Sequence, residues 1–339
     1  MKNEKKILRT QYPWITTYPL FANPLSILQS VQYTYNYILS SFIQVICCKK
    51  NGAISFYDFN YRYCPFFNVQ KISKSFIKEQ SNYIETITYF MNKEYYLYML
   101  VNPKYIQNYH YEVDGCHDLF VFGFDNERRV FHVADNFTGK YAQKTCSYQE
   151  LENAIENLPH DKEGYLGFNG CVELLSLNKD MKYIEPFFKD NVLRIKDSLS
   201  NYVMGYGAWN DSTPEMRVEP YGYNKFQYGI NCYQFLIDNL LEKGISNIHF
   251  PSYFLIFDHK KHMQRIVSYL DEIGALANGK MYKERVEELT KISNINVNLI
   301  IKDQIAYNRK TEEKIIQNYK NMEVIERGMI KNMLNNIQI

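Results

Sequence analysis

The first cysteine of this 339-residue chain is Cys47, so the N-terminal segment contains none of the seven cysteines. Their number is odd, their spacing is irregular and none forms a Cys-X-X-Cys pair. Both a disulfide framework and a structural zinc site are therefore disfavoured. The N-terminus also lacks the apolar run of a signal peptide. We expect a reduced, cytoplasmic protein without a bound metal.

The sequence also lacks a long apolar run and an excess of charge of either sign. No uninterrupted apolar stretch approaches about 18 residues, so no membrane span is expected. The 39 basic and 37 acidic side chains give a net charge of +2. Nucleic-acid-binding proteins carry a clustered positive excess, so neither nucleic acid nor an anionic membrane is an expected partner. Hydrophobic residues make up 46% of the chain, which is enough for the cores of two domains.

The first half of the chain predicts an α+β domain. Asn23 followed by Pro24 is a helix-start signal, and apolar residues recur after it at helical spacing. Ser147 and Glu150 form a capping box at the start of a later helix. Between the two helices, three runs rich in aromatic and β-branched residues are typical of antiparallel strands. These runs span residues 94–102, 116–125 and 129–135.

The second half has a mostly helical pattern. Apolar residues repeat at helical spacing through most of it, and the Gly- and Pro-bearing segment 205–229 is expected to be a long loop. We therefore expect two consecutive domains. An α+β domain would span residues 1–178, and a helical domain over residues 179–339 would cover its cleft.

His117 and Asp135 are the candidate site residues. His117 lies near the start of one predicted strand and Asp135 near the end of the next, so a hairpin would bring them face to face. A carboxylate opposite an imidazole fixes its tautomer and stabilises its protonated form, as in nucleophile–base–acid triads. Asp118 would point to the other face of the strand, and neither His110 nor His132 has a comparable carboxylate. The pair alone is also compatible with a buried structural histidine.

The segment around this pair resembles the His–Asp hairpin of papain-like cysteine enzymes. The matching residues are His117, Phe120, Val121, Gly123, Asp125, Val133, Ala134 and Asp135. Through these residues the chain is similar to the N-terminal domain family of butirosin biosynthesis protein H. The members of that family are papain-like acyltransferases. The resemblance implies an α+β papain-like fold, with an antiparallel sheet and an N-terminal helix that carries the nucleophile. A mostly helical domain would follow.

The resemblance also implies a reaction and its partners. A Cys-His-Asp triad would transfer an acyl group from a carrier-protein thioester to a small amine, as an amide synthetase of thiotemplated natural-product biosynthesis. Closthioamide-type synthetases, with diaminopropane as acceptor, are the narrower match. The protein would need no cofactor of its own, because the phosphopantetheine arm of the acyl or peptidyl carrier protein brings the acyl group. Lys260, Lys261, His262 and Arg265 are either a carrier-docking surface or an ordinary solvated helix face. The other substrate-binding residues stay undetermined.

The nucleophile of that triad is missing from this sequence. The family places its cysteine at the N-terminus of the first helix, where the helix dipole lowers the thiol pKa. Matching the helix start puts this position at Ala22, or two residues earlier at Leu20, and neither side chain can attack a carbonyl carbon. The N–H of residue 22 would supply one donor of the oxyanion hole. Thr16 stands where the family has a glutamine, six residues before the nucleophile.

Three interpretations of the missing nucleophile stay open. Ala22 replaces a natural cysteine in an inactivated variant, or the chain is a natural pseudoenzyme that binds without chemistry. In the third interpretation another residue attacks. Its candidates are Ser26, Cys64, Cys116 and Cys146. A papain-like peptidase or hydrolase would use the same triad with water as the acceptor.

Overall fold

The computed structural model describes residues 4–48, 52–180, 185, 190–206, 226–305 and 309–339. They form an α+β protein in which the described strands pair in antiparallel fashion. The chain divides into two compact units. The first comprises Met1–Gln32 and Tyr61–Ile184, and the second comprises Tyr33–Asn60 and Glu185–Ile339. The units are therefore not the two consecutive stretches that the sequence predicts, because residues 33–60 join the helical unit.

The first unit is built on a seven-stranded sheet in the order β4-β9-β5-β6-β7-β8, with β1 paired to the far end of β6. Its strands are β1 (Lys5–Ile7), β4 (Phe67–Ser73), β5 (Tyr96–Val101), β6 (His117–Asp125), β7 (Val130–Phe137), β8 (Lys140–Ser147) and β9 (Cys171–Leu177). The three predicted strand runs are confirmed as β5, β6 and β7. Strand β6 is buried over all but its first residue, as its long apolar run requires.

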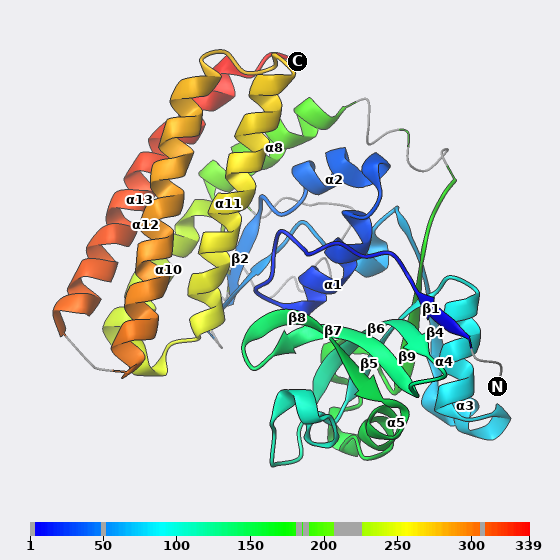
Figure 1. The fold of residues 1–339 in the computed structure, drawn as a ribbon. Coiled ribbons are helices and arrows are strands. Elements are labelled where there is room, and N and C mark those ends of the chain that lie inside the picture. Colours follow the sequence, from blue (N-terminus) through cyan, green and yellow to red (C-terminus); the bar gives the residue numbers. More distant parts are fainter. Residues whose placement is uncertain (1–3, 49–51, 181–184, 186–189, 207–225, 306–308) are drawn as a thin grey trace. The chain divides into compact units, whose positions relative to one another are not determined.

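Helices cover both faces of this sheet (Figure 1). They are α1 (Pro19–Leu28), α3 (Lys74–Gln80), α4 (Tyr83–Asn92) and α5 (Tyr148–Glu156). Helix α1 packs on β6 and β7, and α5 contacts β5 and β8. The predicted capping box of α5 is confirmed: Ser147 Oγ accepts from the Glu150 N–H, and the Glu150 carboxylate accepts from the Ser147 N–H. Short 3-10 turns η2 (Tyr61–Tyr63), η3 (Pro103–Tyr105), η4 (Gln107–Tyr109), η5 (His160–Lys162) and η6 (Tyr165–Gly167) complete the unit.

Helix α1 begins earlier than the sequence predicts. Tyr18 is its N-cap residue and Pro19 its first helical residue, whereas Asn23 and Pro24 lie inside the helix. The predicted cap is therefore wrong. The tyrosine at the N-cap makes no side-chain capping bond, so the usual polar signal is absent from the true start. Asn23 instead accepts a hydrogen bond at 3.0 Å from the Tyr141 hydroxyl of the sheet.

The second unit is mostly helical, as predicted. Its helices are α2 (Tyr35–Ser40), α8 (Asn191–Met204), α10 (Cys232–Lys243), α11 (Phe250–Glu272), α12 (Gly279–Ile305) and α13 (Arg309–Asn336), with turns η8 (Gly229–Asn231) and η9 (Ile245–Asn247). Helices α11, α12 and α13 lie side by side (Figure 1). A small sheet in the order β10-β2-β3 joins β2 (Val45–Cys48), β3 (Ala53–Phe56) and β10 (Phe226–Tyr228). Most of the loop expected over 205–229 lies outside the described residues.

Tyrosines fill much of the buried space in both units. Eight of the twelve largest fully buried side chains in the described residues are tyrosines, so each brings a hydroxyl that requires a partner. In the first unit, two of the eight donate to buried carboxylates, Tyr98 to Asp118 and Tyr61 to Glu173, and the buried Tyr109 likewise donates to Asp135. None of the helices in the described segments is long and apolar enough to span a membrane.

Candidate active site

His117 and Asp135 are in direct contact, as predicted. Nδ1 of His117 lies 2.8 Å from Oδ2 of Asp135. The two residues are not directly opposite, however. Strands β6 and β7 pair Phe120 with Ala134, and continuing this register places His117 diagonally from Asp135. The imidazole is long enough to bridge that diagonal.

The carboxylate of Asp135 is fixed on both of its oxygens. Asp135 is fully buried, and its Oδ2 accepts a hydrogen bond from the Tyr109 hydroxyl as well as from His117. Its Oδ1 accepts from the Asn136 N–H at 2.6 Å. Burial raises the pKa of Asp135, while the charge and hydrogen bond of His117 act against that rise. The acid is thus held in one place and orients the imidazole.

His117 carries its charge over an unusually wide pH range. Burial lowers its pKa, but the hydrogen bond and charge of Asp135, aided by Asp118, outweigh this and raise it to about 10. Asp118 is the weaker partner, since its Oδ1 lies 3.6 Å from Nδ1 and its Oδ2 accepts from Tyr98. Near neutral pH the ring is therefore an imidazolium that donates from Nδ1 to Asp135.

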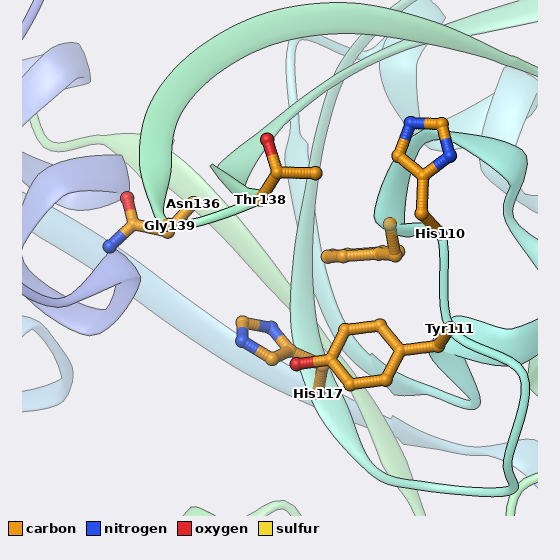
Figure 2. A pocket seen from close by; sticks show the side chains of 7 residues that line it. His110, Tyr111, His117, Asn136, Thr138 and Gly139 are labelled. Atoms are coloured by element: carbon orange, nitrogen blue, oxygen red, sulfur yellow. The ribbon is translucent and has the colours of Figure 1, made fainter. Parts of the chain in front are cut away.

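The other side of the His117 ring opens into a pocket of about 340 Å³ (Figure 2). The pocket is lined by Tyr109, His110, Tyr111, His117, Asn136, Thr138 and Gly139. The side chain of His117 is 28% exposed, and Nδ1 is on its buried side against Asp135. Nε2 has no hydrogen-bond partner among the described residues, so it is the ring atom that a ligand can reach.

Asn136 ties the segment before helix α1 to the site. Its side-chain amide donates to the carbonyl oxygens of Thr16 and Thr17, both at 3.1 Å. Figure 2 shows the N-terminal segment, in blue, beside the Asn136 amide. The predicted oxyanion residue Thr16 is therefore brought near the His117–Asp135 pair, through its backbone.

The start of α1 offers two different environments for a nucleophile. Ala22 is fully buried, and its N–H donates to the Tyr18 carbonyl at 2.9 Å. That N–H is consequently not available to an oxyanion. Leu20 lies in the first turn and is partly exposed, and its N–H has no acceptor among the described residues.

The other nucleophile candidates are inert. Ser26 is buried, and its hydroxyl donates to the Asn23 carbonyl at 2.6 Å. Burial raises the pKa of the Cys116 thiol to about 11 and also raises that of Cys146, which is the reverse of what a reactive thiolate needs. Cys64 is buried. No cluster of His, Cys, Asp or Glu in the described residues could hold a metal ion.

The four residues considered on α11 form neither a continuous docking surface nor a solvated helix face, because two of them are completely buried. Lys260 and His262 are completely buried, and Lys260 forms an ion pair with Glu326 of α13. Lys261 is 31% exposed and pairs with Asp258 at 3.1 Å. The prediction was wrong because other elements cover α11 on more than one side. Some of its polar residues are therefore buried in the core.

No pattern in the sequence pointed to Tyr109 or Asn136 as site residues. Asn136 directly follows Asp135, but adjacency in a strand does not indicate a bond to the segment before α1. Tyr109 lies in turn η4, 26 residues before its partner, and only the fold brings its hydroxyl to Asp135. The chain matches none of the protein-family models with which it was compared, and it matches none of the curated proteins.

Proposed function

We propose that the function of this protein is acyl transfer of the papain-like type, in which an acyl group moves from a carrier-protein thioester to an amine. His117 would be its base and Asp135 its orienting acid. The observation that supports this is the 2.8 Å contact between them, with Nε2 of His117 left open to a pocket. An imidazole that is oriented on one side and free on the other is the arrangement that triads require.

In an active form, a cysteine at the start of α1 would complete the site. The imidazolium and the helix N-terminus would both stabilise its thiolate. The thiolate would attack the thioester carbonyl, forming an acyl-cysteine and releasing the phosphopantetheine sulfur as a thiolate, which takes the Nε2 proton of the His117 imidazolium. The amine would then attack the acyl-cysteine, and His117 would take the proton that the amine loses. The amide leaves and the cysteine thiolate is restored.

The geometry at the start of α1 favours position 20 over position 22. A nucleophile there would be partly exposed, and the free N–H of the same residue could donate to the oxyanion. A cysteine in place of Ala22 would be buried, with its N–H already bonded to Tyr18. With leucine at position 20 and alanine at position 22, the chain as it stands cannot form an acyl-enzyme at either residue.

A noncatalytic binding role is the second candidate. It is favoured by the same absence of a nucleophile, together with a pocket that is open to a ligand. Such a protein would bind an acyl thioester without cleaving it. A hydrolase would share the triad but pass the acyl group to water, and the choice of acceptor separates it from an amide synthetase.

The test is to restore the nucleophile at each position. Leu20→Cys and Ala22→Cys are incubated with a small acyl thioester and followed by intact-protein mass spectrometry. Ser26→Cys is the matched control, one turn further into the same helix. The acyl-transfer proposal expects a mass gain of one acyl group in Leu20→Cys, its loss when His117→Ala is added, and faster discharge with 1,3-diaminopropane than in buffer alone.

Each of the other possible results would support a different function or exclude the triad. An adduct with Ala22→Cys alone would return the nucleophile to position 22. Discharge at the same rate with and without amine would favour a hydrolase. Thioester binding without an adduct in any variant would support the noncatalytic role. An adduct that persists without His117, or that Ser26→Cys forms equally well, would exclude the triad.

A further inference from the structure

A second pocket, of about 400 Å³, lies in the first unit away from His117. Four segments line it: residues 8–9 after β1, residues 30–31 after α1, residues 93–96 between α4 and β5, and residues 176–179 at the end of β9. The Leu8 N–H donates to the Phe122 carbonyl, five residues along β6 from His117. At about 3.3 Å per strand residue, this separates the two pockets by roughly 16 Å along the sheet.

Positive charge outweighs negative charge around this pocket. Arg9, Lys93 and Lys179 line it, and none of the three has a carboxylate partner among the described residues. The ammonium of Lys93 lies 5.8 Å above the ring of Tyr89, a weak contact that it can leave. Glu94 is the one acid in the lining, and the Lys6 ammonium lies 3.8 Å from its carboxylate. The pocket therefore keeps an uncompensated positive field, which attracts anions.

The rest of the lining suits an organic molecule. Tyr95, Tyr96 and Leu177 provide apolar surface, and Ser176 offers a hydroxyl that has no partner among the described residues. The Tyr96 hydroxyl donates to the Arg9 carbonyl at 2.6 Å, which holds the backbone of the arginine at the rim. A volume of about 400 Å³ lies within the usual range of sites for small organic ligands.

We propose that this pocket binds a small organic phosphate. A phosphate monoester carries nearly two negative charges near neutral pH, which matches a site with several cations better than a single carboxylate does. Arg9 would hold its oxygens through the guanidinium fork and Lys179 through its ammonium, since both form strong charge-assisted hydrogen bonds. The organic part would pack against Tyr95 and Leu177. This assignment is independent of acyl transfer, because the two pockets share no lining residue.

Phenyl phosphate is a suitable probe, because it joins an aromatic ring to a phosphate. Its binding is measured by isothermal titration calorimetry at about 0.15 M salt, where exposed charges are largely screened beyond roughly 8 Å. Inorganic phosphate and phenol are titrated separately. We expect saturable one-to-one binding of phenyl phosphate, tighter than that of either half alone.

Variants locate the site. Arg9→Gln and Lys179→Gln each remove one charge-assisted contact and should weaken binding about tenfold or more. Both residues are exposed, so the variants should keep the wild-type melting temperature. Lys140→Gln is the matched control, an exposed lysine of the same unit that does not line this pocket.

Several results would overturn the proposal. One is the absence of saturable binding by phenyl phosphate. Another is unchanged affinity in the Arg9→Gln/Lys179→Gln double variant, or an equal loss in Lys140→Gln. Inorganic phosphate or phenol binding as tightly as phenyl phosphate would remove the assignment to an organic phosphate.

Discussion

The Lys260–Glu326 pair of the helical unit and the His117–Asp135 pair of the first unit both have a fully buried carboxylate, but only the second pair is open to a ligand. In the helical unit, Lys260 and Glu326 are fully buried. The Lys260 ammonium donates to Glu326, to His259 Nδ1 at 2.9 Å and to the Tyr202 hydroxyl at 3.3 Å. The second oxygen of Glu326 accepts from Tyr233 at 2.7 Å. All three ammonium donors and both carboxylate oxygens are thus used.

The pair in the first unit is arranged differently. Asp135 is equally buried and equally saturated, yet His117 keeps Nε2 without a partner and 28% of its side chain exposed on a pocket. A buried charge network whose groups are all satisfied holds elements together. A network with one group left free beside a pocket can act on another molecule. The difference therefore separates a structural centre from a candidate active site, although both are buried ion pairs.

The largest expected effect on stability comes from breaking the Lys260–Glu326 pair. Lys260→Met leaves the Glu326 carboxylate buried without its cation, which should cost about 3–5 kcal/mol of unfolding free energy in urea titrations. Lys291→Met is the control, because Lys291 forms an exposed pair with Glu287 and its loss should cost less than about 1 kcal/mol. Adding Glu326→Leu to Lys260→Met should restore most of the loss. Equal losses in the two single variants would mean that the buried pair is not a structural centre.

Removing one hydroxyl from each centre should give a smaller and unequal effect. Tyr233→Phe deprives Glu326 of a donor in a closed interior and should cost about 1–3 kcal/mol. Tyr109→Phe takes the equivalent donor from Asp135, but water in the pocket that Tyr109 lines can replace it, so about 1 kcal/mol is expected. Tyr111→Phe, at a residue that is 51% exposed, should change stability by less than about 0.5 kcal/mol. A larger loss for Tyr109→Phe than for Tyr233→Phe would contradict the comparison.

The next prediction concerns the charge of His117. Asp135→Asn removes the main cause of its raised pKa, so the value should fall from about 10 toward the ordinary 6.5, measured by NMR titration of the ring protons. Asp118→Asn should lower it less, because the Asp118 carboxylate is 3.6 Å from Nδ1 whereas that of Asp135 is 2.8 Å away. The reverse order would make Asp118 the orienting acid.

The smallest effect is a pH dependence of stability. The pKa of His117 is higher in the folded chain, about 10, than the ordinary 6.5. Its stabilising contribution is therefore complete below pH 6.5 and is lost as the pH rises through about 10. The difference in urea midpoint between wild type and His117→Gln should shrink between pH 6.5 and pH 10. A difference that grows over this range would mean that His117 is neutral in the folded protein.

Sequence signals correctly predicted features that depend only on residues close together in the chain. The capping box of Ser147 and Glu150 was found correctly because both of its bonds lie within four residues of chain. The start of α1 was predicted wrongly. Asn23 and Pro24 form an equally local start signal, but the helix begins at Pro19 instead. Inside the helix, Asn23 bonds to Tyr141 of the sheet, a contact between residues 118 apart in sequence. The burial of Lys260 was missed for a similar reason, since its partner Glu326 lies on another helix.

The sequence by itself determined the strands that carry His117 and Asp135, because alternating and aromatic-rich runs form sheets wherever they occur. It also determined that they would meet, since a short connection leaves a hairpin few alternatives. Only the tertiary structure decided that the Tyr109 hydroxyl donates to Asp135 while Nε2 of His117 stays free on a pocket. It likewise decided that Ala22 is buried and that the first-turn N–H of Leu20 is unbonded. These features depend on contacts between distant segments, which the spacing of residues along one chain does not record.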